Sequence, residues 1–219
     1  MKRMTGAAIL VLLLSSAGSL DAEAAGGSVA RTTVSNSPVT ARASDGMSSS
    51  VTSKHATDTV SDALCHGEHT PPSSSNLALM DAATTCLINR ERTRYGLRPL
   101  RPNSVLQKVA GDQATEMVIG DYFGDDSMTG MTPMQRIAVS HYAWRVHSLR
   151  IGQNIGWGTG TLATPQAMVE GWMDSPPHRE IILTAGYRNI GSGIAPSAPP
   201  ALADGMRGAT YSVELAVRH

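Results

Sequence analysis

The order of helical and strand-like patterns along the chain constrains its fold most. Between residues 77 and 183, apolar residues recur at helical spacing in segments that open with capping residues. Short stretches with strand character, bounded by glycine and proline, lie at 152–157, 189–195 and 210–217. Because helices come first and strands gather in the second half, we predict an α+β domain in which helices cover a small antiparallel sheet.

The expected helices have recognisable starts and ends. The first covers residues 77–95 and is followed by Gly96, a residue suited to the position after a helix C-terminus. Asn103 is placed to cap a second helix. Three further short helices are each expected to open with a capping residue followed by proline at the first helical position. These capping residues are Thr132, Thr164 and Ser175.

The first 64 residues lack these patterns. Lys2 and Arg3, the short apolar run 7–14 and the small residues at 22 and 24 predict an export signal over residues 1–24. The apolar run is well short of the ~20 residues that a membrane-spanning helix needs. Residues 25–64 are rich in Ser and Thr, so we expect a disordered linker, with a pro-segment as the alternative. The folded domain is therefore expected to cover residues 65–219.

The charge balance and the cysteines limit the function classes. Lys and Arg together number 18, as do Asp and Glu, so the formal net charge is zero. This argues against nucleic acid or an anionic membrane as a partner, since both require a basic surface. In an exported chain, Cys65 and Cys86 are expected to form a disulfide. Closing a loop of about 20 residues would contribute about 3 kcal/mol and would attach the start of the domain to its first helix.

Four segments, in order, resemble the CAP superfamily of cysteine-rich secretory proteins, antigen 5 and pathogenesis-related proteins. The resemblance is strongest to its bacterial branch, the SCP domain, and covers roughly residues 76–217. It implies a three-layer α-β-α sandwich, in agreement with the element order. The matching segments are residues 86–100, Gly152-Gln-Asn-Ile-Gly156, Trp172-Met-Asp-Ser-Pro-Pro-His-Arg179, and the closing strands at 190–194 and 211–216.

The resemblance also implies a shallow cleft, in which family members gather two His and two acidic residues that can hold a divalent metal. In this sequence only His178 is unchanged. Asp125 stands where the family's first His follows a Tyr-Phe pair, and Gln153 replaces the Glu of the Gly-Glu-Asn-Ile segment. Glu214 occupies a position that is often acidic on the last strand. The candidate ligand-binding cleft therefore consists of Asp125, Gln153, Asn154, His178, Arg179 and Glu214.

The replacements at two family positions argue against zinc and against catalysis. Asp125 offers oxygen in place of a ring nitrogen, and the neutral amide of Gln153 cannot act as a general base. We therefore expect no metal, no cofactor and no catalytic residue. A weak Ca²⁺ or Mg²⁺ site formed by oxygens of Asp125, Asp126 and Gln153 is a minor alternative. Ser175 is better explained as a helix cap than as a nucleophile.

Several of these side chains also have a structural interpretation. His178 could cap its helix or bridge it to the sheet, and Arg179 could pair with a carboxylate on a helix. Asp125 could cap the turn before the third helix. On the first helix, Asn89 and Arg92 are predicted to tie that helix to the sheet.

The sequence thus favours an exported, non-enzymatic domain that acts outside the cell as a monomer. We expect its partner to be an extracellular ligand, whether lipid, sterol, cell-wall component or protein, with no nucleic acid and no membrane span involved. One alternative is a metal-assisted extracellular hydrolase that uses His178 and Glu214. Another is a structural module of the cell wall, held away from the surface by the Ser/Thr-rich linker.

Overall fold

A five-stranded sheet forms the middle layer of the domain, in a computed structural model that describes residues 17–20 and 65–219. The strand order is β1-β3-β5-β4-β2, and every pair is antiparallel except the parallel pair β2–β4. The strands are β1 (Ala17–Leu20), β2 (Arg101–Pro102), β3 (Leu149–Thr159), β4 (Asn189–Ala195) and β5 (Gly208–Arg218). The three predicted strands correspond to β3, β4 and β5, so the predicted antiparallel sheet forms the centre. The short edge strand β2 makes the whole sheet mixed.

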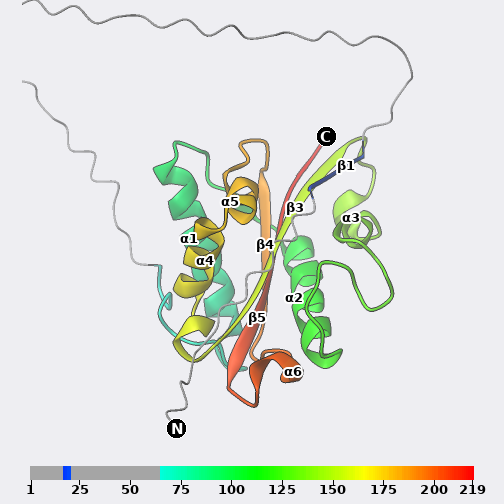
Figure 1. The fold of residues 1–219 in the computed structure, drawn as a ribbon. Coiled ribbons are helices and arrows are strands. Elements are labelled where there is room, and N and C mark those ends of the chain that lie inside the picture. Colours follow the sequence, from blue (N-terminus) through cyan, green and yellow to red (C-terminus); the bar gives the residue numbers. More distant parts are fainter. Residues whose placement is uncertain (1–16, 21–64) are drawn as a thin grey trace, which may run out of the picture. The chain divides into compact units, whose positions relative to one another are not determined.

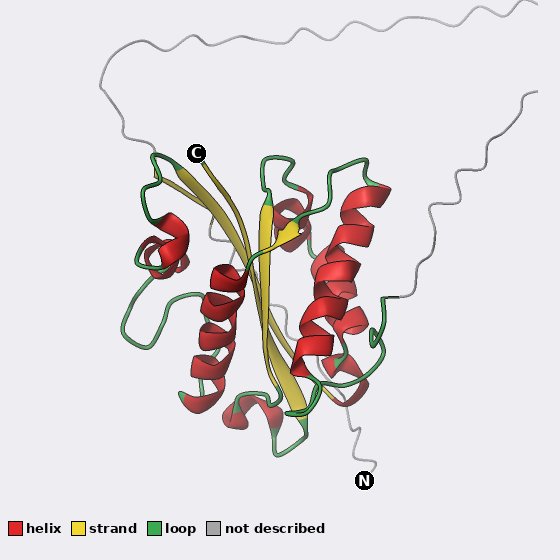
Figure 2. Cartoon of the chain, turned by 180° about the vertical axis from the view of Figure 1, so that it is seen from behind, coloured by secondary structure: helices red, strands yellow, loops and turns green. Residues whose placement is uncertain are grey.

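Helices lie on both faces of this sheet. One face is covered by α1, α4 and α5, and the other by α2 and α3 (Figures 1 and 2). The helices are α1 (Leu77–Arg94), α2 (Ser104–Ile119), α3 (Pro133–Ala138), α4 (Pro165–Asp174), α5 (Pro176–Leu183) and α6 (Pro200–Ala203). The predicted three-layer α-β-α sandwich is confirmed. No helix among the described residues is long and apolar enough to cross a bilayer.

Most of the predicted helix starts are correct. The side chain of Asn103 accepts hydrogen bonds from the main-chain N–H groups of Val105 and Leu106 at the start of α2. Thr132 forms a capping box with Gln135 at the start of α3. These contacts satisfy donors that the first helical turn leaves without partners. Each cap fixes the point where the chain leaves a loop and enters a helix.

Apolar side chains fill both spaces between the layers. The larger core lies beneath α1, α4 and α5, and centres on Trp172 and Tyr211, whose rings meet edge to face at 6.4 Å. Their polar atoms are satisfied, because Trp172 donates to the Ile155 carbonyl and Tyr211 to the Ala163 carbonyl. The smaller core lies beneath α2 and α3. Buried polar side chains, among them Gln153 and Glu214, share that second face.

The predicted disulfide is present at the entry to the domain. Cys65 and Cys86 are bonded, with their Cα atoms 5.7 Å apart. Nearby, the buried carboxylate of Glu68 accepts a 3.1 Å bond from Arg90, which also donates to Gln166 on α4 at 2.9 Å. The turn that begins the domain is therefore attached to α1 by a covalent bond and an ion pair, and to α4 by the hydrogen bond from the Gln166 N–H to the Glu68 carbonyl.

The two α1 residues predicted to reach the sheet behave differently. Asn89 exchanges two hydrogen bonds with the main chain of Leu100, the residue just before β2, and so ties α1 to the sheet edge as predicted. Arg92 is completely buried and donates to the carbonyls of Ile182 and Thr184 at 2.5 and 3.0 Å. The prediction for Arg92 was wrong in its target, because its long side chain holds the end of α5 rather than the sheet.

Candidate functional site

Gln153 and Glu214 form a buried pair across two neighbouring strands. They lie directly opposite one another in the β3–β5 ladder. The amide of Gln153 donates to Glu214 Oε1 at 2.6 Å, and both residues are completely buried. Directly opposed side chains on one face of a sheet interact strongly. The register of β3 against β5 thus brings these two candidate residues into contact.

Asn154 projects to the opposite face of the sheet from Gln153, because successive side chains on a strand alternate. A Cβ added to Gly152, which shares the Asn154 face, would meet Ile181 of α5 and Tyr187. Asn154 Nδ2 donates to the main-chain carbonyl of His178 on α5 at 3.1 Å. Asn154 therefore anchors the start of α5 to β3.

His178 lies in the first turn of α5 and is completely buried. Its Nδ1 is 2.8 Å from the hydroxyl of Ser175, which occupies the N-cap position but makes no bond to the helix main chain. Proline at both of the first two helical positions removes two main-chain N–H groups from this turn. Ser175 therefore orients the imidazole of His178, in place of the helix-capping bond expected from the sequence.

Arg179 and Asp125 have contacts that differ from their predicted structural roles. The guanidinium of Arg179 donates to the Met173 carbonyl at 3.3 Å, so it connects the ends of α4 and α5 rather than pairing with a carboxylate. The helix α3 itself is capped by Thr132, and no hydrogen bond between the Asp125 side chain and the turn before α3 is present among the described residues. The Asp125 carboxyl oxygen Oδ1 is instead buried and has no hydrogen-bond partner in the described part of the chain.

Asp125, Arg136 and Glu214 influence one another's charge on the face that α2 and α3 cover. Burial raises the pKa of Glu214 to about 7, although Arg136 and the Gln153 amide both act to lower it. The Asp125 carboxyl acts to raise that pKa. Burial also raises the pKa of Asp125 to about 6, with Asp126 acting in the same direction and Arg136 against it. These carboxyls therefore lie within electrostatic range of each other and of one guanidinium.

Two participants, Gln113 and Arg136, were not among the candidates from the sequence. Gln113 is completely buried on α2 and donates to the Gly124 carbonyl at 3.0 Å, which holds the loop that carries Asp125. Arg136 on α3 donates to the Met131 carbonyl at 2.8 Å. Gln113 falls at helical spacing with the buried apolar residues of α2, and a polar residue within such an apolar stripe is the signal available in the sequence. No comparable sequence pattern distinguishes Arg136 from other charged residues.

We call Gln113, Asp125, Arg136, Gln153 and Glu214 the polar cluster. Within the described part of the chain, each contributes at least one buried polar atom that lacks a hydrogen-bond partner. These atoms are Gln113 Oε1, Asp125 Oδ1, Arg136 Nε and Nη2, Gln153 Oε1 and Glu214 Oε2. Buried polar atoms are nearly always paired with protein or with ordered water. The polar cluster can therefore accept water molecules or the polar group of a ligand.

Most side chains of the polar cluster are not of the types that zinc prefers as ligands. Zinc in proteins prefers imidazole, thiolate and carboxylate ligands, whereas the cluster offers two amides and a guanidinium beside its carboxyls. The positive charge of Arg136 also opposes a divalent cation. Within residues 17–20 and 65–219, no three His, Cys, Asp or Glu side chains gather in an arrangement that could hold a metal.

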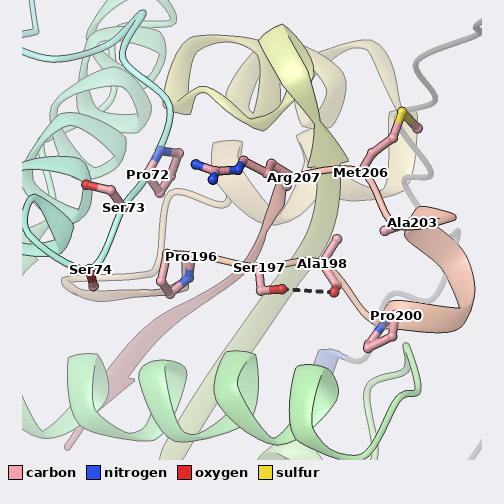
Figure 3. Close-up of a pocket in the computed structure, with 12 residues that line it drawn as sticks. Pro72, Ser73, Ser74, Pro196, Ser197, Ala198, Pro200, Ala203, Met206 and Arg207 are labelled. Carbon is pink, nitrogen blue, oxygen red and sulfur yellow. Dashed lines mark hydrogen bonds between the residues drawn. The ribbon is translucent and has the colours of Figure 1, made fainter.

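A cavity of about 580 Å³ lies where residues 72–74 face the connection between β4 and β5. Figure 3 shows the side chain of Arg207 extending toward Pro72, and it labels Ser197 and Met206 among the residues that line the cavity. None of the candidate residues lines this cavity. The helix α6, which forms part of its wall, had not been expected from the proline-rich sequence there.

Solved structures of similar proteins have modest overlap with this chain. An outer surface protein from Borrelia burgdorferi is 21% identical, covers 62% of this chain and 90% of its own, and has a TM-score of 0.49. An extracellular protein containing an SCP domain from Bacillus anthracis is 21% identical, with coverage of 64% and 40% and a TM-score of 0.47. A cysteine-rich secretory protein from Staphylococcus aureus is 20% identical, with coverage of 66% and 40% and a TM-score of 0.47.

Sequence comparisons define the family. The uncharacterized protein YkwD of Bacillus subtilis is 29% identical over 128 residues, a match that covers 58% of this chain. The match covers 47% of YkwD, so this chain spans about half the length of that relative. The family model described as "CAP: Cysteine-rich secretory protein family" matches residues 86–200, which is more than half of the chain. This chain therefore belongs to the CAP family of cysteine-rich secretory proteins.

Proposed function

We propose that this protein is exported and acts outside the cell as a binding domain, taking a polar group of its ligand into the polar cluster without catalysing a reaction. The supporting observation is the set of buried, unpaired atoms on those five residues. Unpaired acceptors outnumber unpaired donors there, so a ligand that donates hydrogen bonds would satisfy most of them. Lipid, sterol, cell-wall and protein ligands all carry such groups, and the proposal includes each class.

Proton transfer is the one reaction step for which the cluster has a suitable group. The pKa of Glu214, at about 7, is appropriate for a general acid or base. However, Glu214 is completely buried, and one of its oxygens is occupied by the Gln153 amide. A general base must reach the proton that it removes. Binding is therefore the better-supported role, and hydrolysis is the alternative.

An extracellular location is supported by the disulfide together with the predicted export signal. Disulfides persist in oxidising compartments and are rare in the cytosol. The bond between Cys65 and Cys86 is thus suited to a protein that functions outside the cell. The linker proposed for residues 25–64 would hold the domain at a distance from a cell surface. A role in the cell wall is therefore one form of the same proposal.

Co-sedimentation with isolated cell envelopes tests binding directly. We expect the wild-type protein to sediment with one envelope fraction, and the bound component to be recovered unchanged by mass spectrometry. Asp125→Asn should weaken this association about tenfold, since it removes a charged acceptor from the cluster. Asp112→Asn is the matched control, because that exposed carboxylate pairs with Lys108 and belongs to no part of the cluster. Failure to sediment with any fraction contradicts binding, and recovery of a cleaved component establishes the hydrolase instead.

A metal titration tests the positions of the cluster residues. We expect Zn²⁺, Mg²⁺ and Ca²⁺ to leave the thermal unfolding midpoint of the wild-type protein unchanged relative to a chelator control. The double variant Asp125→His, Gln153→Glu restores family-like ligands and should gain a zinc-dependent increase in that midpoint. If Zn²⁺ leaves the unfolding midpoint of the double variant unchanged, positions 125 and 153 do not share one site.

A further inference from the structure

A second cavity, which we call the edge groove, lies at the sheet edge where α1 and α2 approach each other. Its volume is about 430 Å³, within the range of small-ligand sites. The Gln107 amide of α2 donates to Asp81 Oδ2 of α1 at 3.0 Å and so bridges the two helices. The lining contains no Lys or Arg, and its polar members are Asp81, Thr85, Asn89, Asn103, Gln107 and Ser192. None of these belongs to the polar cluster.

The carboxylate of Asp81 has unused hydrogen-bonding capacity. Its Oδ2 accepts from Gln107, but its Oδ1 is buried and has no partner in the described part of the chain. Burial raises the pKa of Asp81 to about 6, while hydrogen bonding from the side chains of Gln107 and Ser192 acts to lower it. No ion pair to Asp81 is present among residues 65–219. The groove thus holds a partly buried negative charge without a protein counter-charge.

Ser192 provides a second acceptor beside this carboxylate. The residue is only 2% exposed and lines the groove. Its hydroxyl lies close enough to Asp81 for hydrogen bonding to lower the pKa of that carboxyl, although no bond of ordinary geometry joins Ser192 Oγ to any described residue. The Ser192 side chain faces α1, because glycines 191 and 193 on either side face α2. A hydroxyl that donates to a carboxylate can still accept a hydrogen bond on its oxygen, so Ser192 Oγ remains available to a donor in the groove.

The main chain of β4 adds a third acceptor. The carbonyls of Arg188 and Ile190 point toward β2, where they accept from the N–H groups of Arg101 and Asn103. Carbonyl directions along a strand repeat every second residue, so the next one in this series is that of Ser192. Strand β2 ends at Pro102 and offers it no partner. The Ser192 carbonyl is therefore directed into the edge groove.

We propose that the edge groove binds a primary ammonium group, of the kind found on a lysine side chain or a polyamine. Such a group has three N–H donors and no acceptor. The groove offers three acceptors around one cavity: Asp81 Oδ1, Ser192 Oγ and the Ser192 carbonyl oxygen. The Asp81 carboxylate also supplies the negative charge that an ammonium group requires. An alcohol lacks the charge, and a quaternary ammonium lacks the N–H groups. Anionic ligands are disfavoured because no cation lines the groove.

NMR titration of the ¹⁵N-labelled protein with n-butylamine at pH 7.5 tests this site. We expect saturable shifts of the main-chain amide signals of Gln107, Gly191 and Ser192, and none with 1-butanol or tetramethylammonium. Asp81→Asn, which keeps the shape of the side chain, should weaken binding at least tenfold. Ser192→Ala should weaken it by a smaller factor. Asp112→Asn, an exposed carboxylate on α2, should leave it unchanged.

Acidification gives an independent readout. Asp81 is the titratable group lining the groove, and protonation near its pKa of about 6 removes the counter-charge. Lowering the pH to 5 should therefore weaken butylamine binding about tenfold in the wild-type protein and little in Asp81→Asn. Tyr211, which lies in electrostatic range of Asp81, remains neutral over this interval because burial raises its pKa.

A lysine-containing tripeptide with blocked ends and the polyamine spermidine distinguish the two sources of the ammonium group. Tighter binding of the peptide than of butylamine identifies a protein lysine, and tighter binding of spermidine identifies a polyamine. Equal shifts with butylamine and 1-butanol would overturn the proposal, as would unchanged affinity in a folded Asp81→Asn variant. Either result leaves the proposed role of the polar cluster unaffected, since the two sites share no residue.

Discussion

The amide of Gln153 determines how the buried Glu214 carboxyl is held. If residue 153 carried a carboxyl, two acids would meet at the present 2.6 Å separation, and they would have to share a proton or bind a cation. The amide instead donates a hydrogen bond and brings no charge. The Gln153–Glu214 pair therefore needs no metal ion to offset repulsion between two carboxylates. Burial still raises the pKa of the Glu214 carboxyl strongly.

That raised pKa predicts how stability changes with pH. Glu214 titrates at about 7 when folded, against 4.5 for an ordinary Glu, so the unfolded chain releases the proton more readily. The free energy of unfolding should fall as the pH rises from about 5 to 8, by on the order of 3 kcal/mol. Asp125 contributes in the same direction. Glu214→Gln should remove most of this decrease in urea unfolding experiments at pH 5, 6, 7 and 8.

The matched control is Asp112→Asn, which should retain the wild-type pH dependence because that carboxylate is exposed. An equally steep decrease in Glu214→Gln would mean that other groups cause it. A wild-type protein whose stability does not change over this range would mean that Glu214 is not protonated in the folded state.

The packing of α2 on β4 depends on two glycines. A Cβ at Gly193 would lie 2.0 Å from the Gly111 nitrogen and 2.4 Å from the Ala110 carbonyl carbon. These contacts are with main-chain atoms, so no side-chain rotation can relieve them. Gly191 has an equally close approach to the main chain of α2. The helix can therefore lie directly on the strand, which sets the position from which the Gln113 side chain bonds the loop that carries Asp125.

Gly193→Ala should separate α2 from the sheet and lower the free energy of unfolding by about 2–3 kcal/mol. Gly111→Ala is the matched control from the other side of the same contact. Its Cβ would meet nothing within 4 Å, so helix propensity should raise stability by roughly 0.5–1 kcal/mol. Urea unfolding of both variants measures the two changes. Opposite signs support the direct contact, and equal signs contradict it.

The helices and the central strands could be predicted because their signals are local. A capping side chain such as Asn103 needs only the next few residues, and the alternation of strand residues is visible in the sequence. The two-residue strand β2 and the four-residue helix α6 were missed because they are too short to show periodicity. Tertiary contacts, rather than local preference, keep such short elements in place.

The candidate site could be predicted only in part, for a similar reason. Motif positions identified Gln153 and Glu214, but their contact depends on the register of β3 against β5, which no spacing within one strand specifies. Alternation along β3 does separate Gln153 from Asn154, a consequence available from the sequence once the strand was assigned. Arg136 comes within electrostatic range of Asp125 and Glu214 through the packing of α3, and no local sequence pattern indicates that proximity.

At the scale of the whole molecule, the apolar cores described lie within residues 65–219. The disulfide joins the first of these residues to α1. Glu68 and Arg90 add a buried ion pair to the same region. We propose that the stable folded unit begins at Cys65 and that the expected linker over residues 25–64 is not required for stability, while the edge strand β1 (Ala17–Leu20) adds only its pairing with β3.

Three shortened chains test this division of the molecule. Chains beginning at residue 25 and at residue 65 should have equal free energies of unfolding in urea, within about 0.5 kcal/mol, because both keep the cores and the disulfide. A chain beginning at residue 76 loses Cys65 and should be less stable by about 3 kcal/mol, since its unfolded state is no longer cross-linked. Reduction of the residue-65 chain should reproduce most of that loss. If the residue-65 chain is instead less stable than the residue-25 chain by more than about 1 kcal/mol, segment 25–64 must contribute to the folded state and is not a spacer.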